Sequence, residues 1–240
     1  MTSALKATFL LAIISLTASF AQAQNAGLIH VFPQVVDGVW GDGTVYTSRF
    51  LIASTGGSSA TYQISLFGIN PERLSAPASV MVQGGSFETI TTRGADVVDT
   101  GYARLDCSQP VVASLTYSVV SAAGKPLGIA TVPSAPIASA ALIPIVLNGR
   151  YRYGIATAND NDTPQVVVFL FDSGTTSQVW TVELQPRSQY VTFVDDVFDV
   201  PAAGLGTLRV GSVGGAMNFH IEALLFDQGG FTNVLPLVIL

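Results

Sequence analysis

The carboxylates that lie in two short clusters are the residues of this 240-residue chain best suited to chemistry. Asp160 and Asp162 alternate with asparagines in one cluster, and Asp195, Asp196 and Asp199 form the other. Such oxygens can bind calcium, but calcium takes roughly six to eight of them, and the acid spacing of an EF-hand loop is missing. Aspartate and asparagine are also common in turns, where they tolerate unusual backbone angles. We therefore expect a turn at Asp160 and Asp162, with calcium binding as the alternative.

Nucleophilic and metal-assisted catalysis have few residues to draw on. The chain holds two histidines, His30 and His220, and one cysteine, Cys107. A hydrolytic triad needs a nucleophile, a histidine base and an orienting acid, and a zinc site needs several histidine or cysteine ligands. We predict no catalytic residue, no cofactor apart from the calcium alternative, and no enzymatic activity. A single cysteine also excludes an intrachain disulfide.

Four aromatic residues form the remaining candidate site. Trp40 and Tyr46 flank a Gly-Asp-Gly turn at 41–43, and Tyr151 and Tyr153 occupy a corresponding position later in the chain. If they are exposed, these rings form a patch that binds sugar or protein. If they are buried, they close the end of a domain. We favour burial and keep the binding patch as the alternative.

The chain repeats itself. Leu66-Phe67-Gly68 recurs as Leu170-Phe171-Asp172, and Leu51-Ile52-Ala53 recurs as Ile155-Ala156-Thr157, with the same offset in both cases. Repetition at a period of about one small domain indicates two copies of one unit. We therefore expect Leu66 and Leu170 to lie in equivalent environments.

Short apolar runs separated by turn residues are typical of antiparallel β structure. We predict an all-β fold of two tandem antiparallel β-sandwich domains of immunoglobulin-like type, with repeats at 24–123 and 142–240 and a proline-containing linker at 124–141. Polar turns precede the strands expected at 61–67 and 165–171, which predicts a hairpin between each strand and the one before it. A single continuous two-sheet structure and a pair of repeats that share a strand are the alternatives.

Residues 1–23 have the features of a cleaved secretory signal peptide. Lys6 precedes an apolar run, and Ala21-Gln22-Ala23 fits the small-x-small cleavage rule. The run is too short to cross a bilayer comfortably, because a spanning helix needs about 20 apolar residues. We expect export, with no membrane span after cleavage, and a location in the periplasm, at the cell surface or in the medium.

Composition limits the possible partners. The formal net charge is −6, and only 11% of the residues are charged against 49% that are hydrophobic. Cleavage of the signal peptide removes Lys6 and no acidic residue, so the mature chain is more acidic still. An acidic surface without a basic run repels phosphate backbones, which argues against nucleic acid as a partner.

Part of the sequence resembles a known group of proteins. The segment Phe32-Pro33-Gln34-Val35-Val36-Asp37-Gly38 leads to Trp40 and is followed by the apolar runs 50–54 and 60–67. These residues resemble uncharacterised secreted bacterial proteins built from tandem immunoglobulin-like β-sandwich repeats, which carry a Pro-x-x-x-Asp-Gly opening with a nearby Trp. The second repeat departs from the pattern, since it has Asn148-Gly149 and no Trp. The resemblance implies fold and export, and it implies no activity.

The sequence predicts an exported, non-enzymatic structural or interaction module of adhesion-like type. Its edge strands or loop tips would contact a protein or a glycan at the cell surface. One alternative is a carbohydrate- or calcium-dependent binding protein. The other is a periplasmic assembly chaperone, which needs basic anchor residues between its two domains. Arg150 and Arg152 are the only basic pair at the expected boundary.

Overall fold

The computed structural model describes residues 26–75, 79–94, 96–213, 219–227, 230–234 and 236–239. Within these residues the chain is almost entirely antiparallel β-strand, with a 3-10 turn η2 (Pro71–Arg73) and one short helix α2 (Val194–Val197). The expected all-β antiparallel fold is therefore confirmed. The signal peptide predicted at 1–23 lies outside the described residues. No helix in the part of the chain that the structure describes is long and apolar enough to cross a membrane.

The first half of the molecule is one seven-stranded sheet that curves over on itself and is nearly barrel-like. The N-terminal part of the long strand β6 pairs with β1 and β3, whereas its C-terminal part pairs with β2 and β7. The strands of this half are β1 (Gly27–Val39), β2 (Val45–Ala53), β3 (Ala60–Phe67), β4 (Ser79–Val82), β5 (Phe87–Thr91), β6 (Asp99–Val120) and β7 (Pro126–Pro133).

β6 is 22 residues long because it runs through two stretches of core. Ser108, Gln109 and Pro110 are exposed between two segments whose side chains are alternately buried. The pairing of β6 with β1 shifts register at this point, between the Gly27 and Ile29 partners. A bulge of this kind bends a strand and increases its twist. One strand can therefore pair with different neighbours at its two ends.

The second half forms two separate five-stranded sheets. One has the order β13-β10-β15-β16, with β8 paired to β15, and the other has the order β12-β11-β14-β9-β17. The strands are β8 (Ile137–Ala138), β9 (Ala140–Leu147), β10 (Arg152–Asn159), β11 (Gln165–Asp172), β12 (Ser177–Leu184), β13 (Ser188–Phe193), β14 (Gly204–Ser212), β15 (Phe219–Asp227), β16 (Gly230–Val234) and β17 (Leu237–Ile239).

Strand pairing in the first half recurs in the second. β3 pairs with β4 and β6 as β11 pairs with β12 and β14, and β2 pairs with β5 and β6 as β10 pairs with β13 and β15. The β1–β6 and β6–β7 pairings correspond to β9–β14 and β15–β16. β14 and β15 thus take the place of the two parts of β6. The interpretation of the chain as two copies of one unit stays a prediction.

The prediction of a hairpin before each of the strands β3 and β11 is wrong. β2 does not pair with β3, and β10 does not pair with β11, within the described pairings. The polar turns between them carry the chain from one sheet region to another. In the second half, buried Asn159 fixes this crossing, because its Nδ2 donates to the carbonyl oxygens of Thr163, Leu184 and Gln185.

The expected equivalence of Leu66 and Leu170 is also wrong. Leu66 packs against the first core, whereas Leu170 lines a shallow depression on the outer face of its sheet. The buried residues of β11 are Val167, Phe169 and Phe171, so Phe171 is the counterpart of Leu66. A shift of one residue exchanges the two faces of a strand. The offset read from the sequence is therefore one residue out of register at this position.

Each half has its own buried apolar cluster, one drawn from β1–β7 and the other from β8–β15 with α2. The segment 124–141, expected as a linker, contains β7 and β8 and the start of β9. The immunoglobulin-like arrangement is not confirmed, because the first half forms a single continuous sheet. What holds in both halves is antiparallel β structure around an apolar core.

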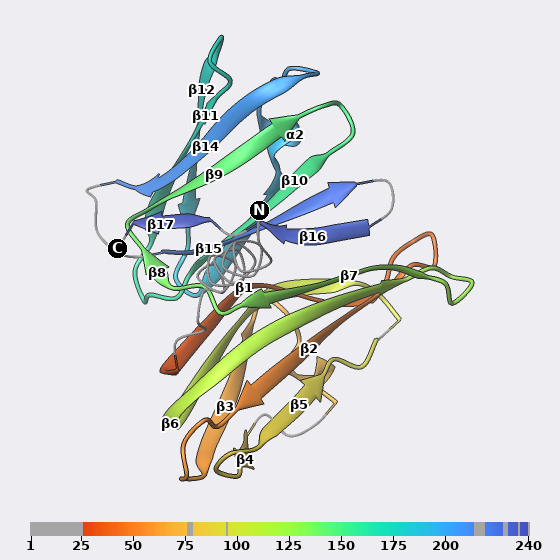
Figure 1. Cartoon of the computed structure of the whole chain (residues 1–240), viewed down its shortest axis with the longest axis vertical. Helices are drawn as coiled ribbons and strands as arrows, with labels where there is room; N and C mark the ends of the chain where they lie inside the picture. The colour runs from red at the N-terminus through yellow and green to blue at the C-terminus, as the bar shows by residue number, and fades with distance from the viewer. Residues whose placement is uncertain are drawn as a thin grey trace, which may run out of the picture.

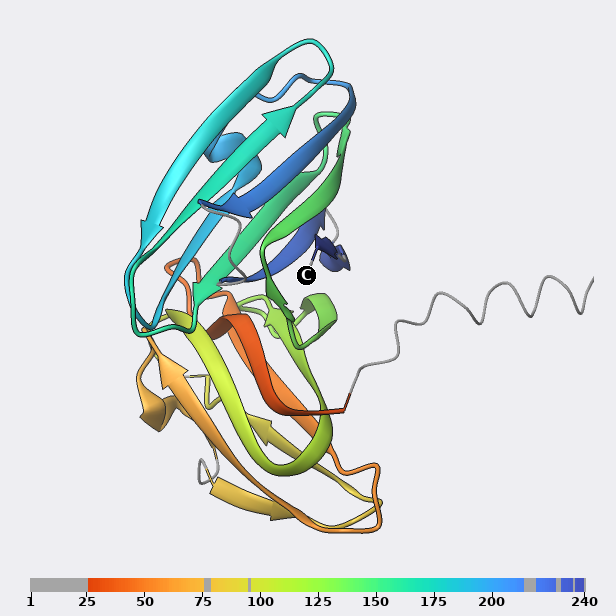
Figure 2. The same cartoon turned by 90° about the vertical axis from the view of Figure 1, so that its left-hand side faces the viewer.

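The two halves pack closely against each other (Figures 1 and 2). β16 lies along β7, and β1 lies against β10 and β15. Phe231 of β16 packs against the core of the first half, and a Cβ on Gly128 of β7 would come within 2.7 Å of its ring. The glycine therefore lets the two strands approach closely.

Candidate functional site

Asp160 lies at the junction between the halves, directly after β10. Its carboxylate is 9% exposed and accepts hydrogen bonds from three groups. Oδ2 is 2.7 Å from Arg104 Nη1 of β6, and Oδ1 is 2.6 Å from Arg187 Nη1 and 3.1 Å from the Tyr102 hydroxyl. Burial together with the Asp160 carboxylate raises the pKa of Tyr102 above its ordinary value. Asp160 therefore links the first half to the second by charge-assisted hydrogen bonds.

Asp162 lies at the rim of the same cluster. It is 86% exposed and pairs with Arg187 Nε at 3.0 Å. Arg104 also makes a two-pronged contact with Asp106, and its pKa is raised first by that hydrogen bond and then by Asp160. Across the described residues, no group of three histidines, cysteines or acids is placed to hold a metal ion. Calcium at Asp160 and Asp162 stays a prediction, and it must compete with two guanidinium groups.

The cationic partners of Asp160 could not be found from sequence spacing. Arg104 lies more than fifty positions before it, and Arg187 lies in the turn between β12 and β13. Arg187 has φ = 52°, the only positive value of a non-glycine residue in the described chain. Few non-glycine residues adopt a positive φ, because the Cβ atom then clashes with the backbone. Here it occurs in the residue that joins Asp160 to Asp162.

Trp40 is the most exposed of the four predicted aromatic residues, at 56%. It begins the turn between β1 and β2, where its N–H donates to the carbonyl oxygen of Thr44. Tyr46 is half-buried on β2, and burial followed by the charge of Asp42 raises its pKa. Our preference for burial is therefore wrong for Trp40, which presents its indole to solvent.

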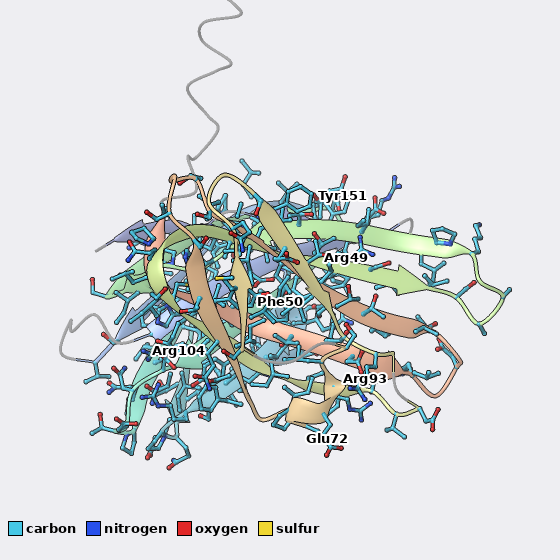
Figure 3. The ribbon with its side chains drawn as sticks, turned by 90° about the horizontal axis from the view of Figure 1, so that it is seen from below. Arg49, Phe50, Glu72, Arg93, Arg104 and Tyr151 are labelled. Carbon is cyan, nitrogen blue, oxygen red and sulfur yellow. The ribbon has the colours of Figure 1, made fainter. Side chains whose placement is uncertain are left out.

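Tyr151 and Tyr153 belong to the second core. Tyr153 is 5% exposed, and its hydroxyl accepts a hydrogen bond from the Val146 N–H at 2.8 Å. Tyr151 is half-buried and packs against the same core. Figure 3 shows Tyr151 far from Arg104, and it shows Phe50 surrounded by the strands of the first half. Tyr151 and the Asp160 cluster therefore do not form one site.

The second acidic cluster is engaged in ion pairs on the surface. Arg152 donates to Asp195 at 2.7 Å and to Asp196 at 2.6 Å. Its guanidinium carbon also lies 4.0 Å from the centre of the Phe193 ring. Asp199 bonds through its backbone to Gln178 at the start of β12. The cluster fixes the α2 segment against β10 and β12.

A buried acid that the sequence analysis missed connects the halves. Glu222 of β15 is 5% exposed, and its Oε1 lies 2.8 Å from the hydroxyl of Tyr117 on β6. The same hydroxyl lies 2.8 Å from the carbonyl oxygen of Gln34 on β1. Glu222 Oε2 has no hydrogen-bond partner. Burial raises the pKa of Glu222 to about 8 and raises that of Tyr117 well above its ordinary value.

Hydrogen-bond counting also indicates that Glu222 is protonated. The Tyr117 hydroxyl has one proton, and it faces two acceptors when Glu222 is ionised. When Glu222 is protonated, its own proton is donated to the Tyr117 oxygen, and the tyrosine donates to Gln34. Each of the two 2.8 Å contacts of the Tyr117 hydroxyl then has one donor and one acceptor. No charge is buried without a partner.

The two histidines form hydrogen bonds within the fold, and the cysteine thiol is partly buried. His30 Nδ1 is 2.9 Å from Ser134 Oγ, and His220 Nδ1 is 2.9 Å from the carbonyl oxygen of Ala135. Burial lowers the pKa of both imidazoles. Burial raises the pKa of Cys107 to about 11, which keeps the thiol protonated at neutral pH. The histidines hold the connection between the halves from both sides.

β12 is an edge strand that exposes large apolar side chains. It pairs with β11 over its whole length and with no other strand among the described residues. Val179, opposite Leu170 on the outer face, is 63% exposed, and Trp180, opposite buried Phe169 on the inner face, is 43% exposed. β12 contains no proline, lysine or glycine. Proline and lysine are among the residues that proteins use to protect a free edge.

The other edges are shorter or are covered. β4, β5, β13, β16 and β17 have 4, 5, 6, 5 and 3 residues, against 8 in β12. β7 also has 8 residues, but it has proline at both ends and lies against β16. Beside β12, the outer sheet face carries a shallow depression lined in part by Leu142, Val168, Leu170 and Arg209. Sequence pattern did not single out this edge, because edge position depends on topology.

Comparisons with known proteins give no family. No family model matches the chain, and no curated protein matches it significantly. Similar solved structures include Thermotoga maritima 1070 (14% identity, 42% of this chain and 91% of that one, TM-score 0.32). They also include the CBM22 tandem domain of Paenibacillus barcinonensis Xyn10C (7%, 79% and 80%, TM-score 0.27) and a mutant major pilin of Streptococcus pyogenes (9%, 83% and 82%, TM-score 0.22). These TM-scores are too low to support an argument about function.

Proposed function

We propose that the chain is an exported, non-enzymatic structural or interaction module that contacts another polypeptide through the edge of β12. The unprotected edge is the observation that carries this proposal. An edge strand presents unpaired N–H and C=O groups, and an extended segment can add to it as a further strand. Val179 and Trp180 offer apolar contact on the two faces of the edge.

The positions of the reactive side chains fit a non-enzymatic role. His30 and His220 are buried and hydrogen-bonded to the segment that joins the halves. The Cys107 thiol has a raised pKa, and Glu222 is enclosed between the halves. General acid–base chemistry needs a titratable group within reach of a substrate, which the buried positions of His30, His220 and Glu222 do not offer.

Site-specific photocrosslinking tests the proposal. We expect a crosslinking residue at Val179 to give a covalent adduct with another polypeptide in cells that export the chain. The matched control is Ile129, which is 68% exposed on β7. Absence of an adduct at Val179, or equal adducts at both positions, contradicts an interaction through β12.

A carbohydrate-binding protein is the second candidate, and the exposed indole of Trp40 favours it. Aromatic rings with one exposed face are suited to contact sugars and proteins. Binding to a glycan array that depends on Trp40 separates this candidate from the first. The assembly-chaperone alternative is weaker, because Arg152 is engaged by Asp195 and Asp196, and Arg150 lies 3.7 Å from Asp227.

A further inference from the structure

We propose that the partner of β12 is a second copy of this chain, added antiparallel so that the two β12 strands join their sheets into one. This inference rests on the proposed function, since it names the occupant of the same edge. Antiparallel addition of identical strands produces a two-fold symmetric contact, which closes after two copies. It also pairs backbone groups that β12 leaves free toward solvent.

The two faces of β12 restrict the register of such a contact. Val179 lies opposite Leu170 on the outer face, and Trp180 lies opposite buried Phe169 on the inner face. Residues directly opposite in an extended sheet must share a face, so odd positions of one copy oppose odd positions of the other. A register centred on Trp180 then places Val179 opposite Thr181 and pairs the two Trp180 side chains.

This register is self-complementary in charge. Glu183 is the only charged residue of β12, and it falls opposite Ser177 of the second copy rather than opposite another acid. Aromatic pairs across strands are favourable, and like charges directly opposite are unfavourable. A second copy therefore meets the edge with an aromatic pair at the centre and no opposed charges. On the outer face, Val179 and Thr181 of each copy lie at the contact between the two strands, with Leu170 beside Val179 on β11.

Sedimentation velocity of the purified mature chain over a range of concentrations tests the proposal. We expect a monomer–dimer equilibrium, because a single edge contact is small compared with obligate interfaces. The V179K/T181K double variant should weaken the dimer by at least about tenfold, since the register opposes each new lysine to another one. The V179K/T181E variant should restore it, because the same register then opposes opposite charges.

The matched control is I129K/T131K on β7. Ile129 and Thr131 are exposed and have the same spacing on an edge strand of equal length. This variant should dimerise like the wild type. The proposal is overturned if the wild type stays monomeric, if V179K/T181K dimerises normally, or if the β7 control also loses the dimer. A monomeric wild type that still crosslinks to a different protein at Val179 refutes only the second copy and leaves the proposed function standing.

Discussion

At the scale of single residues, Glu222 makes the packing of the two halves depend on a proton. Its carboxyl lies between β6 and β15, with Oε1 against Tyr117 and Oε2 unpartnered. Burial raises its pKa from 4.5 to about 8. Between these two pH values the folded chain keeps a proton that the unfolded chain releases. The contribution of Glu222 is therefore fully present below pH 4.5 and is lost as the pH rises toward 8.

The E222Q variant tests this directly. A glutamine amide can donate to the Tyr117 oxygen as a protonated acid does, and it does not ionise. We expect the wild type to lose stability relative to E222Q as the pH rises from 5 to 8, by at most about 1.4 kcal/mol per pH unit. Denaturant unfolding at several pH values gives the difference in free energy of unfolding.

Comparing the two proteins removes other titrations from this measurement. His30 and His220 have lowered pKa values, so protonation destabilises the folded chain as the pH falls. Both histidines are present in the wild type and in E222Q, and their contribution cancels in the difference. A difference in stability that is constant across the pH range contradicts a protonated Glu222.

At the scale of elements, the turn after β10 is fixed to two other segments by ion pairs. The Asp160 carboxylate forms ion pairs with Arg104 of β6 and with Arg187 of the β12–β13 turn. It therefore links the turn after β10 to two other parts of the fold. Removing one member of a mostly buried ion pair leaves its partners without a counter-charge, which costs more than the loss of an exposed pair.

The D160N variant should therefore lower the free energy of unfolding by roughly 1–3 kcal/mol, and D162N should change it little. Asp162 is the matched control because it binds the same Arg187 from an exposed position. We also expect calcium to leave the melting temperature of the wild type unchanged. A calcium-dependent rise that D160N abolishes instead supports the calcium hypothesis.

At the scale of the whole molecule, the two halves share apolar contacts as well as ion pairs. Phe231 of β16 packs on the core of the first half. The centre of its ring lies 5.4 Å from that of Phe226, on which it stacks, and 6.5 Å from that of Tyr117. Val31, Tyr102 and Ala158 form a further small cluster that spans both halves. We therefore expect the halves to unfold together in one transition.

The F231A variant should uncouple them. Loss of the ring removes apolar contact between β7 and β16 and should cost roughly 1–3 kcal/mol, because Phe231 is only half-buried. Scanning calorimetry should then show two transitions in place of one. F87A is the control, since Phe87 is 65% exposed on β5 and should be nearly neutral. A single, unshifted transition in F231A contradicts coupling through this contact.

Sequence periodicity by itself determined the all-β class and the approximate positions of most strands. Alternation of apolar and polar residues fixes a strand locally, as in β3, where Tyr62 and Ile64 are buried and Thr61 and Gln63 are exposed. Recurring segments also indicated the correspondence of β3 with β11. These properties depend on neighbouring residues, so a single sequence is enough to predict them.

Only the tertiary structure decided which strands pair, which edge stays free and which polar groups meet. β2 and β3 are adjacent in sequence but belong to different pairings, and Glu222 meets Tyr117 from more than a hundred positions away. We expected Leu66 and Leu170 in equivalent environments, but a one-residue shift places Leu170 on the outer face of its sheet while Leu66 packs on the core. Pairing and burial arise from contacts between distant segments, and local residue patterns carry little information about them.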